Sequence, residues 1–451
     1  MNNDYQELSR ARGFWAASHV GGYKYVDATD AVGNPVLWKY RREGTDDYTE
    51  RKMQATLSNY LRPVTSAYVD FVLRPGVDRG DESEYISFTE WVQNVDGNGS
   101  TMDDFISIRA RDAFVNMTTF AMIDSTATGE EQTAADASGV SYFARSLSAD
   151  AVPYYRIDQN IVREAIVLLH DSAGKFGIYF TDSDMTRFRL QDDNHAPLTV
   201  ASVEPAVPHF YGGCPVVILD YADLHLAADI AEKQKSIFNR ESMLQEELVN
   251  STYTTWAFNC DKPSDGEDTI EMGTRRIVFL GAEANGTQRL GADPAQAASL
   301  REAIQGDVTE IYRTAGLTPG NPVKVGDAES GLAKAFSFNE LKSRLDSYAK
   351  KLEFFEETLS SRWAAATGSP WPGEVTYSRE FDPRDRMHEL ELAIMVISSN
   401  LPDAFKNAQL REASKAFSMS PQERRGMSID AEDSSATAQS IDQKIDETNL
   451  I

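Results

Sequence analysis

The chain has 451 residues, of which 41% are hydrophobic and 10% aromatic, so it is long enough to bury about two or three cores and too apolar to be disordered throughout. Its formal net charge of −26 argues against tight nucleic-acid binding through neutralised phosphates, but not against contact with DNA that must slide past. No run approaches the ~18 apolar residues of a membrane-spanning helix, and the first residues lack the basic-then-apolar pattern of a secretory signal.

The first 221 residues predict a mixed region of helices, turns and strands. Apolar residues recur at helical spacing in three stretches, namely 7–18, 49–73 and 102–124. Pro63 should kink or break the second of these helices. Residues 27–40 are expected as strand or loop, and residues 96–101 as a turn.

From residue 139 to residue 219 the spacing of apolar residues changes toward every second position, which indicates β-strands. We expect strands at 154–157, 165–170, 177–180, 185–190 and 214–219. Residues 172–175 predict a hairpin turn between the second and third of these strands.

The next part begins with a long helix predicted over residues 222–251, in which Ile230, Ile237 and Leu244 recur seven apart. At ~1.5 Å per residue this helix would be about 45 Å long. Strand and turn patterns follow up to residue 289, with strands expected at 256–258 and 276–280. Another helical stripe then runs from Leu300 to Ala315.

Residues 316–335 differ from the helices on either side. Glycines and prolines between Pro319 and Gly331 exclude regular structure for about a dozen residues. Loops of this length in compact domains are functional or disordered. The sequence therefore predicts a loop with a function, and the alternative is a surface linker.

A long helix predicted over residues 336–368 organises the second half of the chain. One face carries an unbroken apolar stripe, made of Phe338, Leu341, Leu345, Tyr348, Leu352, Phe355 and Leu359. Gly368 and Pro370 end this helix. The simplest interpretation is an amphipathic helix packed on its own domain. The polar residues from Ser420 onward are expected to be disordered.

In this order the elements resemble those of the portal (head-to-tail connector) proteins of tailed bacteriophages. The segments that carry the resemblance are Gly-Gly-Cys-Pro-Val-Val at 212–217, Asp223-Leu224 with the helix through Asn239 and Ser242, Ser-Gly-Leu-Ala at 330–333, and Val-Thr-Tyr-Ser-Arg-Glu-Phe at 375–381 before a helix from Arg386. They are similar to the family's passage into its first stem helix, its Ser-Gly-x-Ala segment, and its closing strand and helix. Each motif alone is loose, and their shared order over roughly 200 residues carries the resemblance.

The resemblance implies an α+β, portal-like fold with long stem and wing helices, an α/β wing and a small β-containing clip insert. It divides the chain into an outer wing (1–221), a first stem helix (222–251), a clip (252–293), a second stem helix (294–316), a tunnel loop (317–335), a wing helix with a closing strand (336–385), crown-side helices (386–419) and a disordered tail (420–451).

The same resemblance assigns two sets of site residues. In the tunnel loop, the residues lining a DNA channel would be Pro319, Asn321, Pro322, Val323, Lys324, Val325, Asp327 and Glu329. In the clip, the residues docking partner proteins would be Trp256, Phe258, Asp261 and Lys262. Lys324 in the loop, and Lys233, Lys235 and Arg240 on the first stem helix, would either guide DNA weakly or be ordinary solvent-exposed charges.

The implied function is a ring, commonly of twelve subunits in this family, at the capsid vertex through which double-stranded DNA is packaged and ejected. Its partners would be further copies of itself, double-stranded DNA, the terminase, a head–tail adaptor and the major capsid or scaffold protein. The protein would be assembled in the host cytoplasm and reside in the virion. Apolar stripes that exceed what one subunit can cover would favour a closed head-to-tail ring, and an acidic chain suits a lumen that must not grip phosphates.

Enzymatic interpretations have little support in the sequence. Gly174-Lys175 resembles the end of a phosphate-binding loop, but Leu169 stands where that loop needs glycine and Phe176 where it needs Ser or Thr. The run from Asp96 to Ser100 begins like a calcium loop, but Thr101 replaces the glycine and Ser107 the closing glutamate.

Metal-binding spacing is also missing from the sequence. The six histidines show no paired spacing, and the two cysteines, Cys214 and Cys260, lie far apart and fit a reducing compartment. We therefore expect no enzyme activity, no metal and no cofactor. The alternative to a portal is an acidic α+β scaffold or adaptor without a DNA channel, and an unrecognised hydrolase is less favoured.

Overall fold

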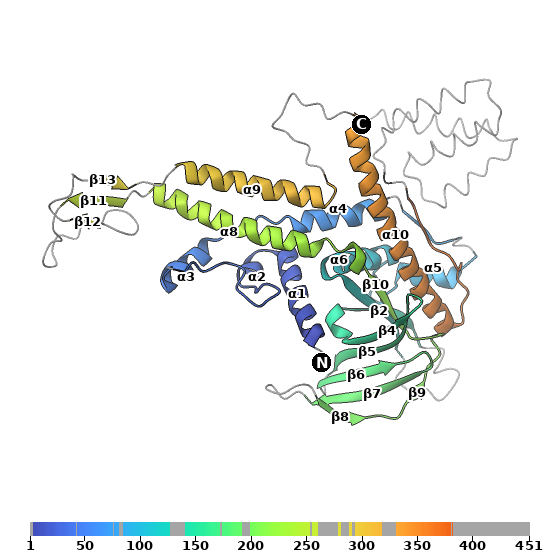
Figure 1. Cartoon of the computed structure of the whole chain (residues 1–451). Coiled ribbons are helices and arrows are strands. Elements are labelled where there is room, and N and C mark those ends of the chain that lie inside the picture. Colours follow the sequence, from blue (N-terminus) through green and yellow to red (C-terminus); the bar gives the residue numbers. More distant parts are fainter. Residues whose placement is uncertain are drawn as a thin grey trace, which may run out of the picture. The chain divides into compact units, whose positions relative to one another are not determined.

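The computed structural model of the chain describes residues 3–41, 43–74, 76–80, 84–126, 140–171, 174–191, 199–252, 255–259, 278–280, 288–290, 294–317, 331–379 and 381. Helices and strands are mixed within these ranges, which confirms the α+β class (Figure 1). The chain divides into two compact units. Unit 1 comprises Met1–Ser66, Phe114–Met117 and His225–Leu341, and unit 2 comprises Ala67–Ala113, Thr118–Leu224 and Lys342–Ile451.

Unit 1 is built mainly from helices. Its elements are α1 (Asn3–Val20), α2 (Tyr23–Val26), α3 (Thr45–Gln54), α8 (Ala227–Thr252), α9 (Pro294–Thr314), and the strands β11 (Thr255–Asn259), β12 (Val278–Leu280) and β13 (Gln288–Leu290). The core forms where α1 and the loop after α2 pack against α8, and it includes Phe14, Tyr25, Leu37 and Phe238. The edge of the Tyr25 ring meets the Phe238 ring with 5.2 Å between centroids, a favourable aromatic arrangement.

Among its described residues, unit 2 contains two large antiparallel sheets and a two-stranded one. The three-stranded sheet has the order β10 (Val216–Asp220), β2 (Thr118–Ser125), β3 (Tyr142–Leu147). The larger sheet is a meander of β4 (Tyr154–Asp158), β5 (Ile161–Asp171), β6 (Gly174–Phe180), β7 (Asp184–Gln191) and β8 (Thr199–Val203), with β9 (Val207–Pro208) also paired to β7. Apolar side chains of both sheets share one core, in which Phe120 and Ile218 meet Val162, Ala165 and Val167.

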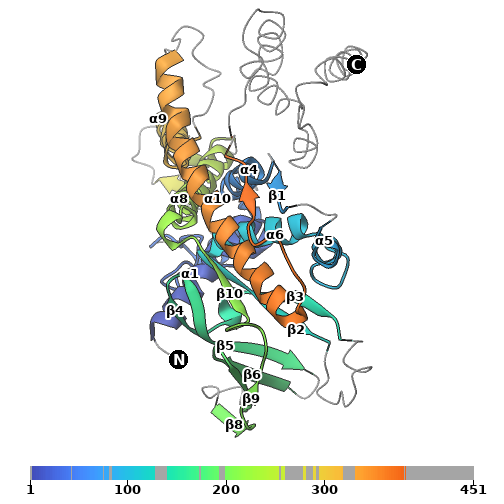
Figure 2. The same cartoon turned by 90° about the vertical axis from the view of Figure 1, so that its right-hand side faces the viewer.

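The remaining elements are mostly helical. They are α4 (Leu61–Leu73), α5 (Ile86–Gln93), α6 (Met102–Asn116), α10 (Gly331–Thr367), the short 3₁₀ turns η1 (Ala149–Ala151) and η2 (Ala222–Leu224), and the two-residue strands β1 (Val77–Asp78) and β14 (Thr376–Tyr377). Strand β14 pairs with β1 and lies beside α10 (Figure 2). The backbone N–H of Tyr377 donates to Glu353 at 2.8 Å, and its hydroxyl donates to Glu356 at 2.6 Å. Helix α10 therefore holds β14 through acidic side chains.

The apolar stripe predicted along α10 is buried. Its described members are Leu341, Leu345, Tyr348, Leu352, Phe355 and Leu359, and all of them are buried within this chain. Farther along the same helix, Trp363 stacks on Trp91 of α5 with 4.9 Å between ring centroids. The stripe is therefore covered by the chain itself, and it does not supply the surplus apolar surface that would favour a ring.

The largest correction concerns residues 102–124, which were predicted as one helix. Helix α6 ends at Asn116, Met117 has a positive φ of 73°, and Thr118–Ser125 form the central strand β2. Most of β2 is buried, because β10 and β3 flank it and the larger sheet covers it. A short apolar run that is buried on both faces has no period that separates a strand from a helix.

The helix predicted over residues 49–73 is interrupted, but not at Pro63. The chain leaves α3 after Gln54 and re-enters a helix only at Leu61. The side-chain oxygen Oε1 of Gln234 accepts the backbone N–H groups of Tyr60 and Leu61, at 2.8 and 3.0 Å, and so caps α4. Pro63 then falls in the first turn, where its missing N–H costs nothing.

Two further helix boundaries differ from the predictions. Residues 222–224 form the 3₁₀ turn η2, so the helix predicted over residues 222–251 begins at Ala227. Helix α10 begins at Gly331, inside the predicted tunnel loop.

Candidate functional site

Helices α8 and α9 of unit 1 run antiparallel and form a hairpin that carries a small sheet at its tip (Figure 1). Arg240 of α8 donates to the carbonyl oxygen of Ala303 at 3.3 Å and pairs with Asp307, one turn farther along α9. Lys233, earlier in α8, lies 3.7 Å from the same Asp307 carboxylate. The order of these contacts fixes the opposite directions of the two helices.

An open groove of about 480 Å³ runs between α8 and α9. Its charged lining consists of Asp229, Glu232, Asp307 and Glu310 against Lys233 and Arg240, which leaves a net charge of −4 + 2 = −2. Both of these bases already pair with Asp307. The groove therefore offers no surplus positive charge to a phosphate.

The tip of the hairpin is a three-stranded sheet with the order β12-β11-β13. Strand β11 pairs parallel to β12 and antiparallel to β13. Trp256 and Phe258, predicted to dock partner proteins, lie on β11, whereas Asp261 and Lys262 lie outside the described residues. The strands expected at 256–258 and 276–280 are thus present over residues 255–259 and 278–280.

The predicted tunnel-loop residues lie outside the described residues. These are Pro319, Asn321, Pro322, Val323, Lys324, Val325, Asp327 and Glu329, between the end of α9 and the start of α10. The crown-side helices and the tail, predicted after residue 385, also lie outside them. What the structure provides is the two helices that anchor the loop.

Three polar side chains on the inner face of α8 fix the N-terminal segment of unit 1. Besides capping α4, Gln234 donates through Nε2 to the carbonyl oxygen of Ser18 at 2.9 Å. Asn239 accepts the backbone N–H of Trp38 at 2.8 Å and donates to the carbonyl oxygen of Val36 at 2.9 Å. Because these amides are fully buried, each missing bond would leave a polar backbone group unsatisfied. The third side chain is the hydroxyl of Ser242, which binds Arg51.

Arg51 of α3 is a further anchor, and it was not predicted. Its buried guanidinium binds Glu43 through two nitrogens, donates to the Ser242 hydroxyl at 3.0 Å, and lies 4.2 Å from the centre of the Tyr40 ring. Hydrogen bonds from Arg51 hold the pKa of Glu43 below its usual value. Nothing in a single sequence separates Arg51 from the many surface arginines.

The basic residues of α8 that were considered as DNA guides are all paired. The ammonium of Lys235 lies 3.2 Å from an oxygen of Asp30 and 2.8 Å from one of Glu232, and most of the side chain is buried. Lys233 and Arg240 share Asp307. Lys235 therefore stabilises unit 1, whereas Lys233, with 46% of its side chain exposed, fits the interpretation of a solvent-exposed charge.

The Gly212-Gly213-Cys214 segment contains two glycines because α10 packs closely against it. Both glycines have positive φ, and a Cβ on Gly213 would lie 2.6 Å from the guanidinium of Arg362. Arg362 is buried and donates to the carbonyl oxygen of Gly212. Burial raises the pKa of the Cys214 thiol to about 12, so this thiol is unreactive at neutral pH. The motif is a packing device that lets α10 approach the strands of unit 2.

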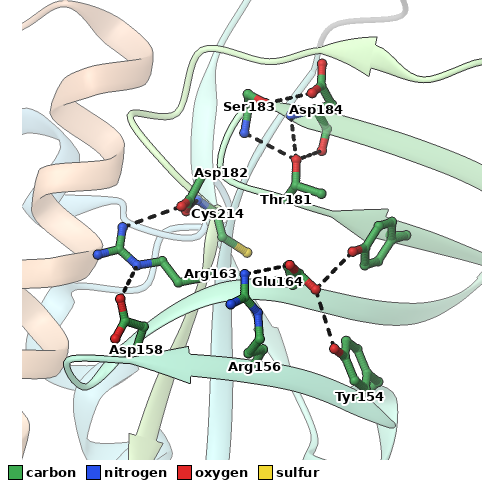
Figure 3. A network of polar contacts seen from close by, with 11 residues as sticks. Tyr154, Arg156, Asp158, Arg163, Glu164, Thr181, Asp182, Ser183, Asp184 and Cys214 are labelled. Carbon is green, nitrogen blue, oxygen red and sulfur yellow. Dashed lines mark hydrogen bonds and ion pairs between the residues drawn. The ribbon is translucent and has the colours of Figure 1, made fainter.

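A polar network covers one part of the larger sheet (Figure 3). Glu164 of β5 pairs with Arg156 at 2.6 Å and accepts the hydroxyl of Tyr179 at 3.0 Å. The residue before Glu164, Arg163, lies 3.5 Å from Asp182, which also accepts the backbone N–H of Cys214 at 3.2 Å. The network joins neighbouring strands and contains no activated nucleophile with a base.

The segment 96–100, which begins like a calcium-binding loop, forms hydrogen bonds within itself. One carboxylate oxygen of Asp96 accepts the N–H groups of Asn98 and Ser100, and the other accepts the Ser100 hydroxyl at 2.7 Å. In the part of the chain that the structure describes, no group of His, Cys, Asp and Glu has the geometry of a metal site. Likewise, none of the described helices is both long enough and apolar enough to span a membrane.

Comparisons with known proteins returned no match, either among protein-family models or among curated proteins. A function for this chain is therefore inferred from its own residues and elements.

Proposed function

We propose that this protein is a portal-type subunit of a ring at a viral capsid vertex, through which double-stranded DNA is packaged and ejected. The terminase and a tail or adaptor protein would dock on the ring. The observation that carries the proposal is the α8–α9 hairpin with a three-stranded sheet at its tip, followed by the 37-residue helix α10. That is the order of stem, clip, stem and wing helix that the sequence resemblance implies.

The charge of the hairpin is consistent with a DNA conduit. Its groove has a net negative charge, and its two bases, Lys233 and Arg240, both pair with Asp307. A surface of this kind makes no counterion-releasing contacts with phosphates, so passing DNA would meet little friction.

A second candidate function is an acidic scaffold or adaptor without a channel. The observation that favours it is the burial of the α10 stripe within the chain, because a ring no longer has to be invoked to cover that surface. Subunit number separates the two candidates.

Negative-stain electron microscopy and native mass spectrometry of the purified full-length protein test the proposal. A portal predicts rings of about twelve subunits with a central channel. A protein that stays monomeric or dimeric at every concentration, also when co-expressed with its capsid and scaffold proteins, would contradict it and favour the adaptor.

The tunnel loop allows a sharper test of the DNA channel. Deleting residues 321–329 removes the Gly- and Pro-rich segment while keeping both anchoring helices, α9 and α10. We expect intact rings that package or retain DNA poorly, measured as nuclease-protected DNA per particle. Rings that retain as much DNA as the parent would reduce this segment to a linker.

A further inference from the structure

The six-stranded sheet of unit 2 ends in two strands that each have a neighbour on one side only. Among the described residues, β4 pairs only with β5, and β8 pairs only with β7. An edge strand presents a row of backbone donors and acceptors to which another strand can add.

Strand β8 has few of the features that protect an edge strand from pairing. Its five residues, Thr-Val-Ala-Ser-Val, include no charge and no proline. Their one protective feature is a bulge at Ala201, between the pairs Ser202–Arg189 and Val200–Leu190. Val200 and Val203 are 56% and 65% exposed, and Phe210, just after β9, is 81% exposed. An apolar edge with so little protection either aggregates or has a partner.

Strand β4, at the opposite edge, has the same length and includes two charged residues, of which Arg156 pairs with Glu164 on β5. Tyr154 and Ile157 are 44% and 40% exposed. The extra residue of the bulge between β4 and β5 is Arg163 on β5, so β4 itself runs without interruption from Tyr154 to Asp158. Aromatic and β-branched side chains form favourable cross-strand pairs.

We propose that β8 of one copy of this chain adds to β4 of the next copy, so that the sheet continues from subunit to subunit. The inference rests on the proposed ring. Successive strands of the meander alternate in direction, so β4 and β8 run the same way and pair in parallel when the sheet is continued. A contact between two different edges is head-to-tail and gives a ring when the rotation between subunits closes, whereas β8 pairing with itself would give a two-fold dimer.

Cross-linking tests which edges meet. In a Cys260→Ser background, which leaves only the buried Cys214, a double variant carrying Ile157→Cys and Val203→Cys is treated with a short bismaleimide. The proposal predicts a ladder of covalent oligomers from the double variant and none from either single variant. A dimer from the Val203→Cys variant alone would indicate two-fold pairing and overturn the proposal.

Two further outcomes separate this inference from the proposed function. Rings in the microscope without any cross-link between positions 157 and 203 overturn the edge pairing and leave the portal proposal in place. A protein that stays monomeric at every concentration overturns both.

Lysines on the edge provide an independent test. A Val200→Lys, Val203→Lys variant should assemble at least about tenfold more weakly, because charged lysines would replace the exposed valines of the edge strand β8. The matched control is Ile108→Lys on α6, which is 48% exposed and lies on neither edge strand. Circular dichroism checks that both variants are folded. An edge variant that assembles as well as the control contradicts the proposal.

Discussion

At the scale of single residues, unit 1 depends on buried polar side chains as well as on its apolar core. Arg51, Gln234 and Asn239 each bind backbone or side-chain groups of segments distant in sequence. Inside a protein such groups are favourable only while every partner is in place. Removing one of these side chains should therefore lower the free energy of unfolding by more than the number of its hydrogen bonds suggests.

The first prediction concerns Arg51. Replacing it with Met keeps much of the volume but leaves the Glu43 carboxylate buried without its main partner, so we expect a loss of about 3–5 kcal/mol in the free energy of unfolding. The control is Arg313→Met, which breaks a solvent-exposed ion pair with Glu310 and should leave the free energy of unfolding nearly unchanged. Urea denaturation measures both, and equal losses would show that Arg51 is no anchor.

The second prediction concerns pH and His225. Its ring lies 4.5 Å from that of Trp15, and Nε2 lies 3.2 Å from the carbonyl oxygen of Val115, so the neutral ring carries its proton on Nε2. Burial lowers the pKa of His225 below its usual 6.5, and the nearby charge of Arg12 adds to this, while the Val115 carbonyl and Asp229 oppose it.

Because the folded pKa of His225 is the lower one, the unfolded chain binds a proton more readily. The stability contributed by the neutral ring is complete above the unfolded pKa and is lost as the pH falls from about 6.5 toward the folded pKa. We expect the free energy of unfolding to drop between pH ~7.5 and pH ~5.5 by more in the wild type than in a His225→Gln variant. Identical drops in the two proteins would exclude this role.

At the scale of elements, two glycines with opposite roles can be compared directly. Gly213 has a φ of 135° and no room for a Cβ beside Arg362, whereas Gly306 lies in an exposed part of α9, where an added Cβ would have nothing within 4 Å. Gly213→Ala should destabilise the protein by about 1–3 kcal/mol through strain and displacement of Arg362. Gly306→Ala should stabilise it by about 0.5–1 kcal/mol, because alanine is the better helix former. Thermal unfolding of both variants measures the two changes in stability. A Gly213→Ala variant as stable as the wild type would refute the packing explanation.

At the scale of the whole molecule, we expect the purified protein to hydrolyse no ATP. Gly174 and Lys175 belong to a tight hairpin, in which Asp171 of β5 pairs with Gly174 of β6, and the described chain continues from there as strand β6, with no helix that could present N–H groups to phosphates. Energy for DNA movement would then come from a separate motor. Steady-state phosphate release by protein from two independent purifications tests this, and turnover that follows the protein through both would refute it.

The functional expectation came from the order of motifs along the chain. The strands predicted at 256–258 and 276–280 lie within two residues of the bounds of β11 and β12, because turn residues mark them in the sequence. Helix α8 begins at Ala227 instead of residue 222, and β13 was not predicted. The tunnel-loop residues and two of the four clip residues lie outside the described residues, so those assignments stay predictions.

Local periodicity and turn-forming residues were sufficient to predict the α+β class, the three long helices and the strands β4 to β7. They did not predict β8 or the order in which the strands pair into a meander. The remaining features depend on contacts between segments that are distant in the sequence. The tertiary structure placed β2 between two strands, where burial on both faces removes the period, and moved the start of α4 to the cap provided by Gln234. It also gave Arg51 and Arg362 their buried partners, since a charge survives burial only where distant segments supply groups to bind it.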